Sequence, residues 1–231
     1  MRKPVSCFSW NNLFFGSPLL SDTTFGRGDG VAGLLDQEVE HDSCGFPYLR
    51  GRTLKGLLRE ECDNLIAVLQ NDSRAYWENL ACTLFGTPGS SLGIIAAMHV
   101  GDACLPDDLR EAVAWQIQDK TLTKEEVLES LTTIRRQTAI DSQTGTANEG
   151  SLRSFRVVIR QLEFKADLLF ETQPSDEMLS ILAVGILAFR RVGSGRNRGR
   201  GYVQCTLHNN VGKEITQDYI SLFGQIQEKV A

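Results

Sequence analysis

Alternating apolar residues between positions 155 and 171 constrain the fold of this chain more than any other pattern. The apolar positions are Phe155, Val157, Ile159, Leu162, Phe164, Ala166, Leu168 and Phe170. A period of two is typical of a strand that buries one face, so we expect a strand here. An apolar segment follows at 175–191, with Ser175 placed to cap a helix and Glu177 in its first turn. This segment therefore predicts a helix.

Four further segments complete the expected order of elements. The patterns predict strands at 5–15, 91–104 and 202–207, and a helix at 53–69 in which leucine and isoleucine recur at helical spacing. The resulting order of strand, helix, strand, strand, helix, strand is the split βαβ, ferredoxin-like arrangement. We therefore expect an α+β fold with two helices on one face of the sheet. The other face would be open to carry RNA, as in RRM-like sheets.

Two long inserts interrupt this order. Residues 16–46 are rich in glycine and polar residues, and a connection of this length is often functional. Residues 106–154 combine a helix-rich part with a polar, turn-rich part at 140–154. Because 231 residues are enough for one large domain, we predict a single domain over residues 1–231 that contains both inserts.

A loop rich in glycine and arginine follows the second helix. Residues 193–201 read Gly-Ser-Gly-Arg-Asn-Arg-Gly-Arg-Gly, and we call this segment the Gly/Arg loop. Glycine lets backbone amides approach a ligand closely, and arginine presents planar charged forks that fit phosphate oxygens. We expect the loop to bind an RNA backbone without base-specific contacts, through Gly193, Gly195, Gly199, Arg196, Arg198 and Arg200.

A second basic segment lies at residues 50–59 and contains Arg50, Arg52, Lys55 and Arg59. Lys55 and Arg59 are four residues apart and would share one helix face. The free backbone N–H groups at the start of a helix also favour the binding of phosphate. The alternative is a solvated basic face paired with Glu60 or Glu61. The whole chain has a net charge of −5, so its positive charge is concentrated locally. A basic stripe on an acidic body fits one nucleic-acid groove.

The composition favours a cytoplasmic protein. No run of about 18 apolar residues is present, so we expect no membrane-spanning helix. The first residues lack the apolar core of a signal peptide. The six cysteines include no CxxC pair, which is typical of reduced thiols in the cytosol. The three tryptophans, Trp10, Trp77 and Trp115, lie in patterned segments, and we expect them in the core.

Several of these segments together resemble the RAMP superfamily of CRISPR systems. Residues 47–59, PYLRGRTLKGLLR, resemble its signature PYIPGSSLKGALR, and the Gly/Arg loop resembles its C-terminal glycine-rich loop. Leu84-Phe85-Gly86 with the strand that follows also fits. Residues 144–147 and 151–153 resemble the thumb hairpin of type III backbone subunits. The resemblance covers almost the whole chain in the same order.

This resemblance implies a backbone subunit of a type III effector complex. Its partners would be CRISPR RNA, single-stranded target RNA, other RAMP subunits and a large signature subunit, with no membrane. Each thumb would displace one base, and the target would be cleaved beside it. The resemblance also implies a catalytic aspartate before the PY motif, and Asp36 lies eleven residues before Pro47. Asp36 would hold a divalent metal ion, Mg²⁺, although its neighbours Leu35 and Gln37 depart from the family pattern.

Other interpretations stay open at this point. The same fold can serve as a non-catalytic RNA-binding scaffold. A stand-alone endoribonuclease could process CRISPR RNA with His41 as general acid or base. An enzyme acting on a non-RNA phosphate ligand would bind nucleotides rather than long strands. The turn-rich part at 140–154 is either a disordered loop or a hairpin that wedges RNA apart with Ile140 or Leu152.

Overall fold

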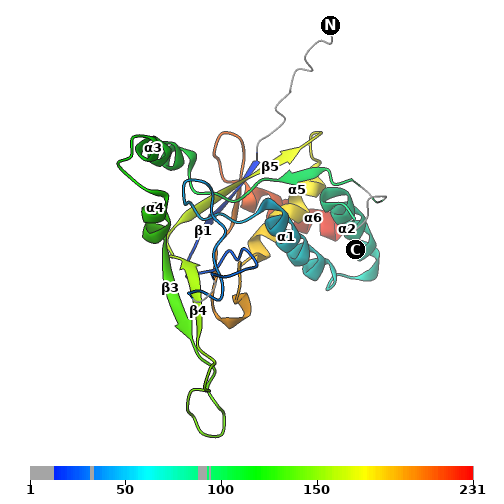
Figure 1. Ribbon diagram of the computed structural model, residues 1–231. Coiled ribbons are helices and arrows are strands. Elements are labelled where there is room, and N and C mark those ends of the chain that lie inside the picture. The colour runs from blue at the N-terminus through cyan, green and yellow to red at the C-terminus, as the bar shows by residue number, and fades with distance from the viewer. Residues whose placement is uncertain (1–12, 32–33, 88–92, 94, 231) are drawn as a thin grey trace.

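A four-stranded antiparallel sheet in the order β2-β5-β1-β6 forms the centre of the computed structural model, which describes residues 13–31, 34–87, 93 and 95–230 (Figure 1). Its strands are β1 (Leu13–Pro18), β2 (Met98–Val100), β5 (Glu163–Phe170) and β6 (Thr206–His208). With α1 (Gly51–Ile66) and α5 (Asp176–Ala188), the order is the ferredoxin-like one, so the expected fold class is confirmed. Most of the predicted strand at 5–15 lies outside the described residues.

The core lies between one face of the sheet and the helices. Along β5 the residues alternate between buried and exposed, as the sequence pattern predicts. On α1 the buried side chains recur every four residues, at Leu54, Leu58, Cys62 and Ile66. Cys62 packs against α5, and its burial raises the pKa of the thiol. None of the helices in the described part of the chain is long and apolar enough to span a membrane.

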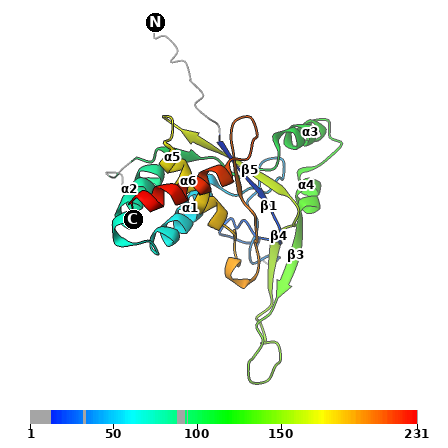
Figure 2. The same cartoon turned by 180° about the vertical axis from the view of Figure 1, so that it is seen from behind.

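Two outer helices close the far side of this core. In Figures 1 and 2, α2 (Asn71–Phe85) and α6 (Thr216–Val230) lie beside α1 and α5. Trp77 on α2 is fully buried, and its ring lies 4.5 Å from the ring of Phe223. The indole N–H of Trp77 donates to Gln227 Oε1 at 2.8 Å, so this polar tip is satisfied. The core position expected for Trp77 is confirmed.

The predicted strand over 155–171 is two strands. Residues Arg153–Val158 form β4, which pairs with β3 (Thr132–Gln137) in a separate two-stranded sheet. The chain then turns at Arg160 and Gln161, and Gln161 adopts a φ of 71°. The apolar positions change from odd to even numbers across this turn, because the residues that follow belong to β5, a strand of the central sheet.

The second insert forms a projecting arm. It contains α3 (Asp107–Gln118), α4 (Lys124–Leu131) and the β3–β4 hairpin, which extends away from the body of the molecule in Figures 1 and 2. Ile140 and Leu152 are 68% and 60% exposed near the hairpin tip. Trp115 on α3 is 73% exposed, so its expected core position is wrong. The helix α3 has no buried residue, so it lies on the surface of the molecule and does not carry Trp115 into the core.

The face of the sheet away from the helices is not basic along its longest strand. The exposed residues of β5 include Glu163, Lys165 and Asp167, which amount to two carboxylates and one amine. Phosphate groups favour cations, so this face is a poor match for an RNA backbone. The expectation that RNA lies on the open face gains no support here, and the arginine-rich surface is found elsewhere.

Two helical glycines provide a test of the packing between α1 and α5. A methyl group added at Gly185 would fall on Cys62 Sγ, whereas one added at Gly56 would meet nothing within 4 Å. We expect Gly185→Ala to destabilise the protein by ~1–3 kcal/mol through overpacking. Gly56→Ala should stabilise it by up to ~1 kcal/mol, because alanine favours helix. Thermal unfolding measures both, and equal shifts for the two variants would contradict the packing.

Candidate nucleic-acid interface

Two buried threonines, Thr23 and Thr24, join the Gly/Arg loop to the hairpin. Thr23 exchanges two backbone hydrogen bonds with Val158 of β4, at 3.1 and 2.6 Å. On its other side, Thr23 Oγ1 donates to the carbonyl of Val192 at 2.8 Å. The carbonyl of Thr24 accepts from the N–H of Ser194, and its hydroxyl donates to the carbonyl of Arg156. The first insert therefore holds two elements together that are far apart in the sequence.

Glycine is required where the Gly/Arg loop meets these threonines. Gly193 and Gly201 have φ values of +80° and +67°, which side chains with a Cβ rarely adopt. A Cβ at Gly193 would overlap Thr23 Oγ1, and one at Gly201 would overlap the carbonyl of Val192. Gly193 was expected to bind RNA, and it lines the hollows that adjoin the loop. It also lets the loop pack closely against Thr23.

Three adjoining hollows run along this junction, and together we call them the groove. The first has a volume of about 200 Å³ and lies between the start of α1, with Tyr48, Arg50 and Thr53, and the Gly/Arg loop. The second, of about 460 Å³, shares Gly193, Ser194 and Arg196 with the first. The third, of about 560 Å³, shares Gln137, Phe155 and Arg198 with the second and reaches the hairpin. The shared walls make the groove continuous.

The groove is strongly basic in an acidic protein. Among the described residues that line it there are five arginines and one carboxylate, namely Arg50, Arg153, Arg196, Arg198 and Arg200 with Glu40. The net charge of the chain is −5. Cations concentrated in a concave surface raise the local concentration of a polyanion. The two basic segments predicted from the sequence therefore meet on one surface, through Arg50 and the Gly/Arg loop.

Neighbouring groups hold three of these arginines in place. Arg50 donates to Glu40 at 2.8 Å, and this hydrogen bond is the largest cause of the raised pKa of Arg50. Arg196 donates to both oxygens of Glu60 at 3.0 Å. The guanidinium of Arg200 lies 5.6 Å from the centre of the Phe155 ring. A cation held in place loses less conformational entropy when it binds phosphate.

Two of the predicted phosphate contacts point elsewhere. Lys55 donates to the carbonyl of Met98 at 3.1 Å, and burial lowers its pKa. Arg59 donates to the carbonyl of Gly86 and pairs with Asp63. Both residues lie on one face of α1, as expected, but that face meets β2 and the end of α2. Neither lines the groove, and neither does Arg52, which is exposed near the start of α1.

Asp36 lies beside the groove, at the start of β4. Its carboxylate accepts from the N–H of Ser154 at 2.7 Å and from Arg153 at 3.0 Å. The N–H of Ser154 and the guanidinium of Arg153 both hold the pKa of Asp36 below its usual value. The next residue, Gln37, lines the second hollow and donates to Ser194 Oγ at 2.8 Å. Asp36 thus ties the first insert to β4.

The Mg²⁺ expected at Asp36 has little preformed support. Within the described residues, no group of three histidine, cysteine, aspartate or glutamate side chains could hold a metal ion. Both oxygens of Asp36 are already engaged by Arg153 and Ser154. Mg²⁺ is commonly held by one or two carboxylates with phosphate oxygens of the substrate. A metal at Asp36 would therefore need RNA to complete its coordination and a movement of Arg153.

His41, the residue of the alternative processing reaction, lies away from the groove. Its Nδ1 is 3.1 Å from the carbonyl oxygen of Asp42, and its backbone forms an isolated antiparallel β-bridge with Pro47. It does not line any of the three hollows. Because a general base must reach the proton that it removes, the position of His41 does not favour a role in the cleavage of RNA bound along the groove.

Sequence reasoning missed several groove residues. Gln37, Gln137, Arg153 and Phe155 line the second or third hollow, and none was a predicted RNA contact. Arg153 belongs to the segment that resembles a thumb hairpin, which was the available signal. Phe155 fits a strand pattern, so the sequence alone predicts that it is a core residue. Its contact with Arg200, 45 positions later, depends on tertiary structure.

Comparisons with known proteins identify a family and a similar fold. A family model described as the RAMP superfamily matches residues 13–204. The fold is similar to a solved chain of type III-B Cmr-beta bound to cognate target RNA, with 15% identity, a TM-score of 0.62, and coverage of 91% of this chain and 98% of that one. An apo-state Cmr-beta chain has 15% identity and a TM-score of 0.60, with coverage of 92% and 99%. No curated protein matches the sequence.

The contacts of Asp36 predict how it titrates. Its pKa should lie below that of an ordinary aspartate, so its tie to the hairpin is present above that ordinary pKa and is lost as pH falls through the lowered value. Arg153→Gln should restore only part of the shift, since the N–H of Ser154 is the larger cause. NMR titration of the carboxyl carbon measures both. A full return to the ordinary pKa in this variant would contradict the arrangement.

Proposed function

The chain belongs to the RAMP superfamily, and from this membership and its groove we propose that it is a backbone subunit of a type III CRISPR effector complex that binds CRISPR RNA. The observation that carries the proposal is the continuous basic groove. It is built from the start of α1, the Gly/Arg loop and the part of the hairpin where β3 ends and β4 begins. The sequence separates the start of α1 from the hairpin by about 80 residues, and the hairpin from the Gly/Arg loop by about 40.

The chemistry of the groove suits a strand of any sequence. Its cations are arginines, which bind phosphate through paired N–H groups. Contacts to phosphate position a nucleic acid without reading its bases. A subunit that accepts different guides needs this kind of contact, because sequence would be read by pairing between guide and target. The groove therefore supports RNA backbone binding better than recognition of one nucleotide ligand.

The proposal extends to the partners. The similar solved chains come from type III-B Cmr-beta, one of them bound to target RNA. We propose CRISPR RNA, single-stranded target RNA, other RAMP subunits and a large signature subunit as partners, in the cytoplasm. The exposed Ile140 and Leu152 near the tip of the hairpin are suited to displace a base from a paired strand. Apolar side chains perform such unstacking in other nucleic-acid complexes.

A second part of the proposal concerns cleavage of the target RNA with Asp36 and Mg²⁺. It is supported by the place of Asp36 before the PY motif and by its position next to Arg153, which lines the third hollow. A non-catalytic scaffold is the alternative, since the carboxylate is held by hydrogen bonds in this structure. A processing enzyme that uses His41 is less well supported, because His41 lies outside the groove.

RNA binding should depend on salt and on the Gly/Arg loop. For single-stranded RNA, log K should fall by about 0.7 for each phosphate contact as log salt concentration rises. Replacing Arg196, Arg198 and Arg200 with glutamine should reduce this slope by up to about 2 and lower the affinity for RNA of every sequence to the same extent. Fluorescence anisotropy with a labelled mixed-sequence RNA measures the slope.

The matched control removes three charges elsewhere. Arg74, Lys213 and Lys229 are exposed, lie outside the groove, and change the net charge by the same amount when replaced with glutamine. This control should retain most of the slope. Equal losses in both triple variants, or a flat salt response in the unchanged protein, would contradict binding in the groove.

Cleavage by Asp36 is tested in the assembled complex. If Asp36 is catalytic, Asp36→Ala in every copy should abolish regular cuts in the target, and EDTA should do the same to the unchanged complex. Asp29→Ala is the control, because Asp29 is an exposed acid of the same insert that pairs with Arg27. Regular cuts that persist with Asp36→Ala would leave the scaffold role as the better account.

A further inference from the structure

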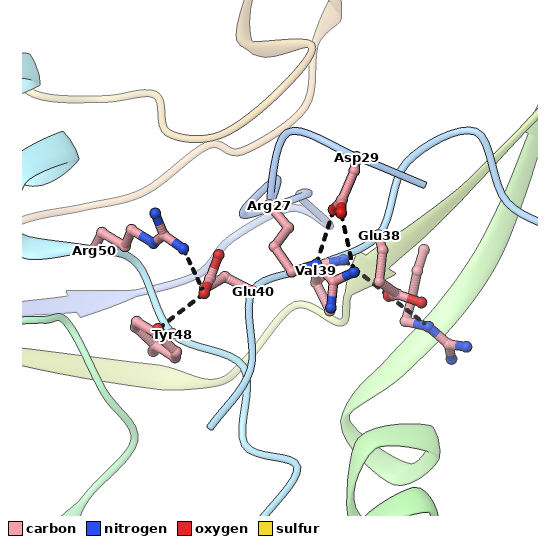
Figure 3. A network of polar contacts seen from close by, with 8 residues as sticks. Arg27, Asp29, Glu38, Val39, Glu40, Tyr48 and Arg50 are labelled. Carbon is pink, nitrogen blue, oxygen red and sulfur yellow. Dashed lines mark hydrogen bonds and ion pairs between the residues drawn. The ribbon is translucent and has the colours of Figure 1, made fainter. Parts of the chain in front are cut away.

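Glu40 is a buried carboxylate with one oxygen that receives no hydrogen bond within the described chain. Its Oε1 accepts from Tyr48 at 3.0 Å and from Arg50 at 2.8 Å, as Figure 3 shows. Its Oε2 is shielded from solvent and has no partner among the described residues. A buried polar atom without a hydrogen bond is costly, and a charged one more so. Such an atom calls for a donor from outside the chain.

The nearby cation does not supply that donor. Arg27 lies next to Glu40 in Figure 3, but its guanidinium is bound to Asp29 at 2.8 and 3.2 Å. The two hydrogen bonds at Oε1 of Glu40 already use both of its lone pairs. Oε2 retains two. These two lone pairs are left for a donor bound next to Glu40.

Glu40 forms part of the wall of the first hollow, opposite the Gly/Arg loop. The hollow has a volume of about 200 Å³, which is below the ~300–1,000 Å³ of pockets that enclose drug-sized ligands. Arg50 and Arg196 line the same space. The site therefore offers a hydrogen-bond acceptor beside two cations. Its ligand should present one donor next to a negative charge.

One nucleotide of RNA presents this combination. The ribose 2′-hydroxyl is a donor on a sugar that carries phosphates on both sides, and it is the group that distinguishes RNA from DNA. The N–H groups of the bases, such as those of guanine and cytosine, are other donors that a carboxylate accepts, but they would restrict the sequence that the groove can take. The ribose is present at every position, so it agrees with a groove that otherwise contacts phosphate.

We propose that Glu40 accepts a hydrogen bond from the 2′-hydroxyl of a nucleotide bound in the first hollow and thereby selects RNA over DNA. The inference rests on the proposed RNA binding and deepens it. Tyr48 and Arg50 are positioning residues here, because they fix the Oε1 atom and leave Oε2 for the ligand.

The test compares single strands of one mixed sequence that differ only at the 2′ position. A 2′-fluoro strand keeps an RNA-like sugar but cannot donate a hydrogen bond. The unchanged full-length protein should bind the 2′-hydroxyl strand roughly tenfold more tightly, as for one hydrogen bond to a charged group. Glu40→Gln keeps the side-chain volume and turns the free acceptor into a donor. It should bind both strands about equally.

Glu38→Gln is the matched control. Glu38 is a buried glutamate of the same segment, but its Oε1 accepts from the N–H of Val39 and pairs with Arg156, and it does not line the first hollow. This variant should keep the preference. Equal binding of the two strands by the unchanged protein would overturn the ribose contact while leaving RNA binding intact, and this comparison needs no variant to fold.

Three further outcomes separate the sources of error. A preference that disappears when one kind of base is left out of the strands would assign the contact to that base and overturn the ribose contact. Failure to bind either strand at any salt concentration would contradict the proposed function itself. If Glu40→Gln weakens both strands by the same factor and keeps the preference for the 2′-hydroxyl strand, Glu40 acts only through Arg50, which also overturns the proposal.

Discussion

Hydrogen bonds from Thr23 and Thr24 to two distant parts of the chain determine where the groove lies. These threonines are 0% and 1% exposed, so their polar groups must be satisfied internally. They bond to β4 on one side and to the Gly/Arg loop on the other. The loop can come this close only because Gly193 and Gly201 lack a Cβ. This junction, together with the contact of Arg200 with Phe155, fixes the arginines of the loop relative to the hairpin.

The acidic partners of the arginines explain how a chain with net negative charge can present a basic track. Glu60 and Glu40 hold Arg196 and Arg50 in place, and Asp36 holds Arg153. The pairs of Arg196 with Glu60 and of Arg153 with Asp36 are partly exposed, and such pairs contribute little to stability. Their effect is to orient cations toward the groove, where a phosphate can compete for them. The same logic gives Asp36 a structural contact that RNA binding would have to change before the carboxylate could act in cleavage.

The sequence was informative where a pattern is local and less so where partners are distant. The order of elements and the apolar faces of α1 and β5 follow from periodicity, and the loop after α5 follows from its glycines. Periodicity also placed Lys55 and Arg59 on one face, but it did not reveal that β2 and α2 cover that face. In the sequence, the turn at Gln161 shows only as a shift of the apolar residues from odd to even positions. The exposure of Trp115 depends on how α3 packs, which its local pattern does not determine. Asp36 meets Ser154 across 118 positions, a contact that no local pattern predicts.

Photo-cross-linking of a bound strand tests the position of the groove most directly. A single-stranded RNA that contains 4-thiouridine at several positions would be irradiated on the full-length protein, and the cross-linked peptides would be identified by mass spectrometry. We expect cross-links in residues 48–53, 137–155 and 193–200. Cross-links concentrated on the open face of the sheet, around Lys165 and His99, would contradict binding in the groove.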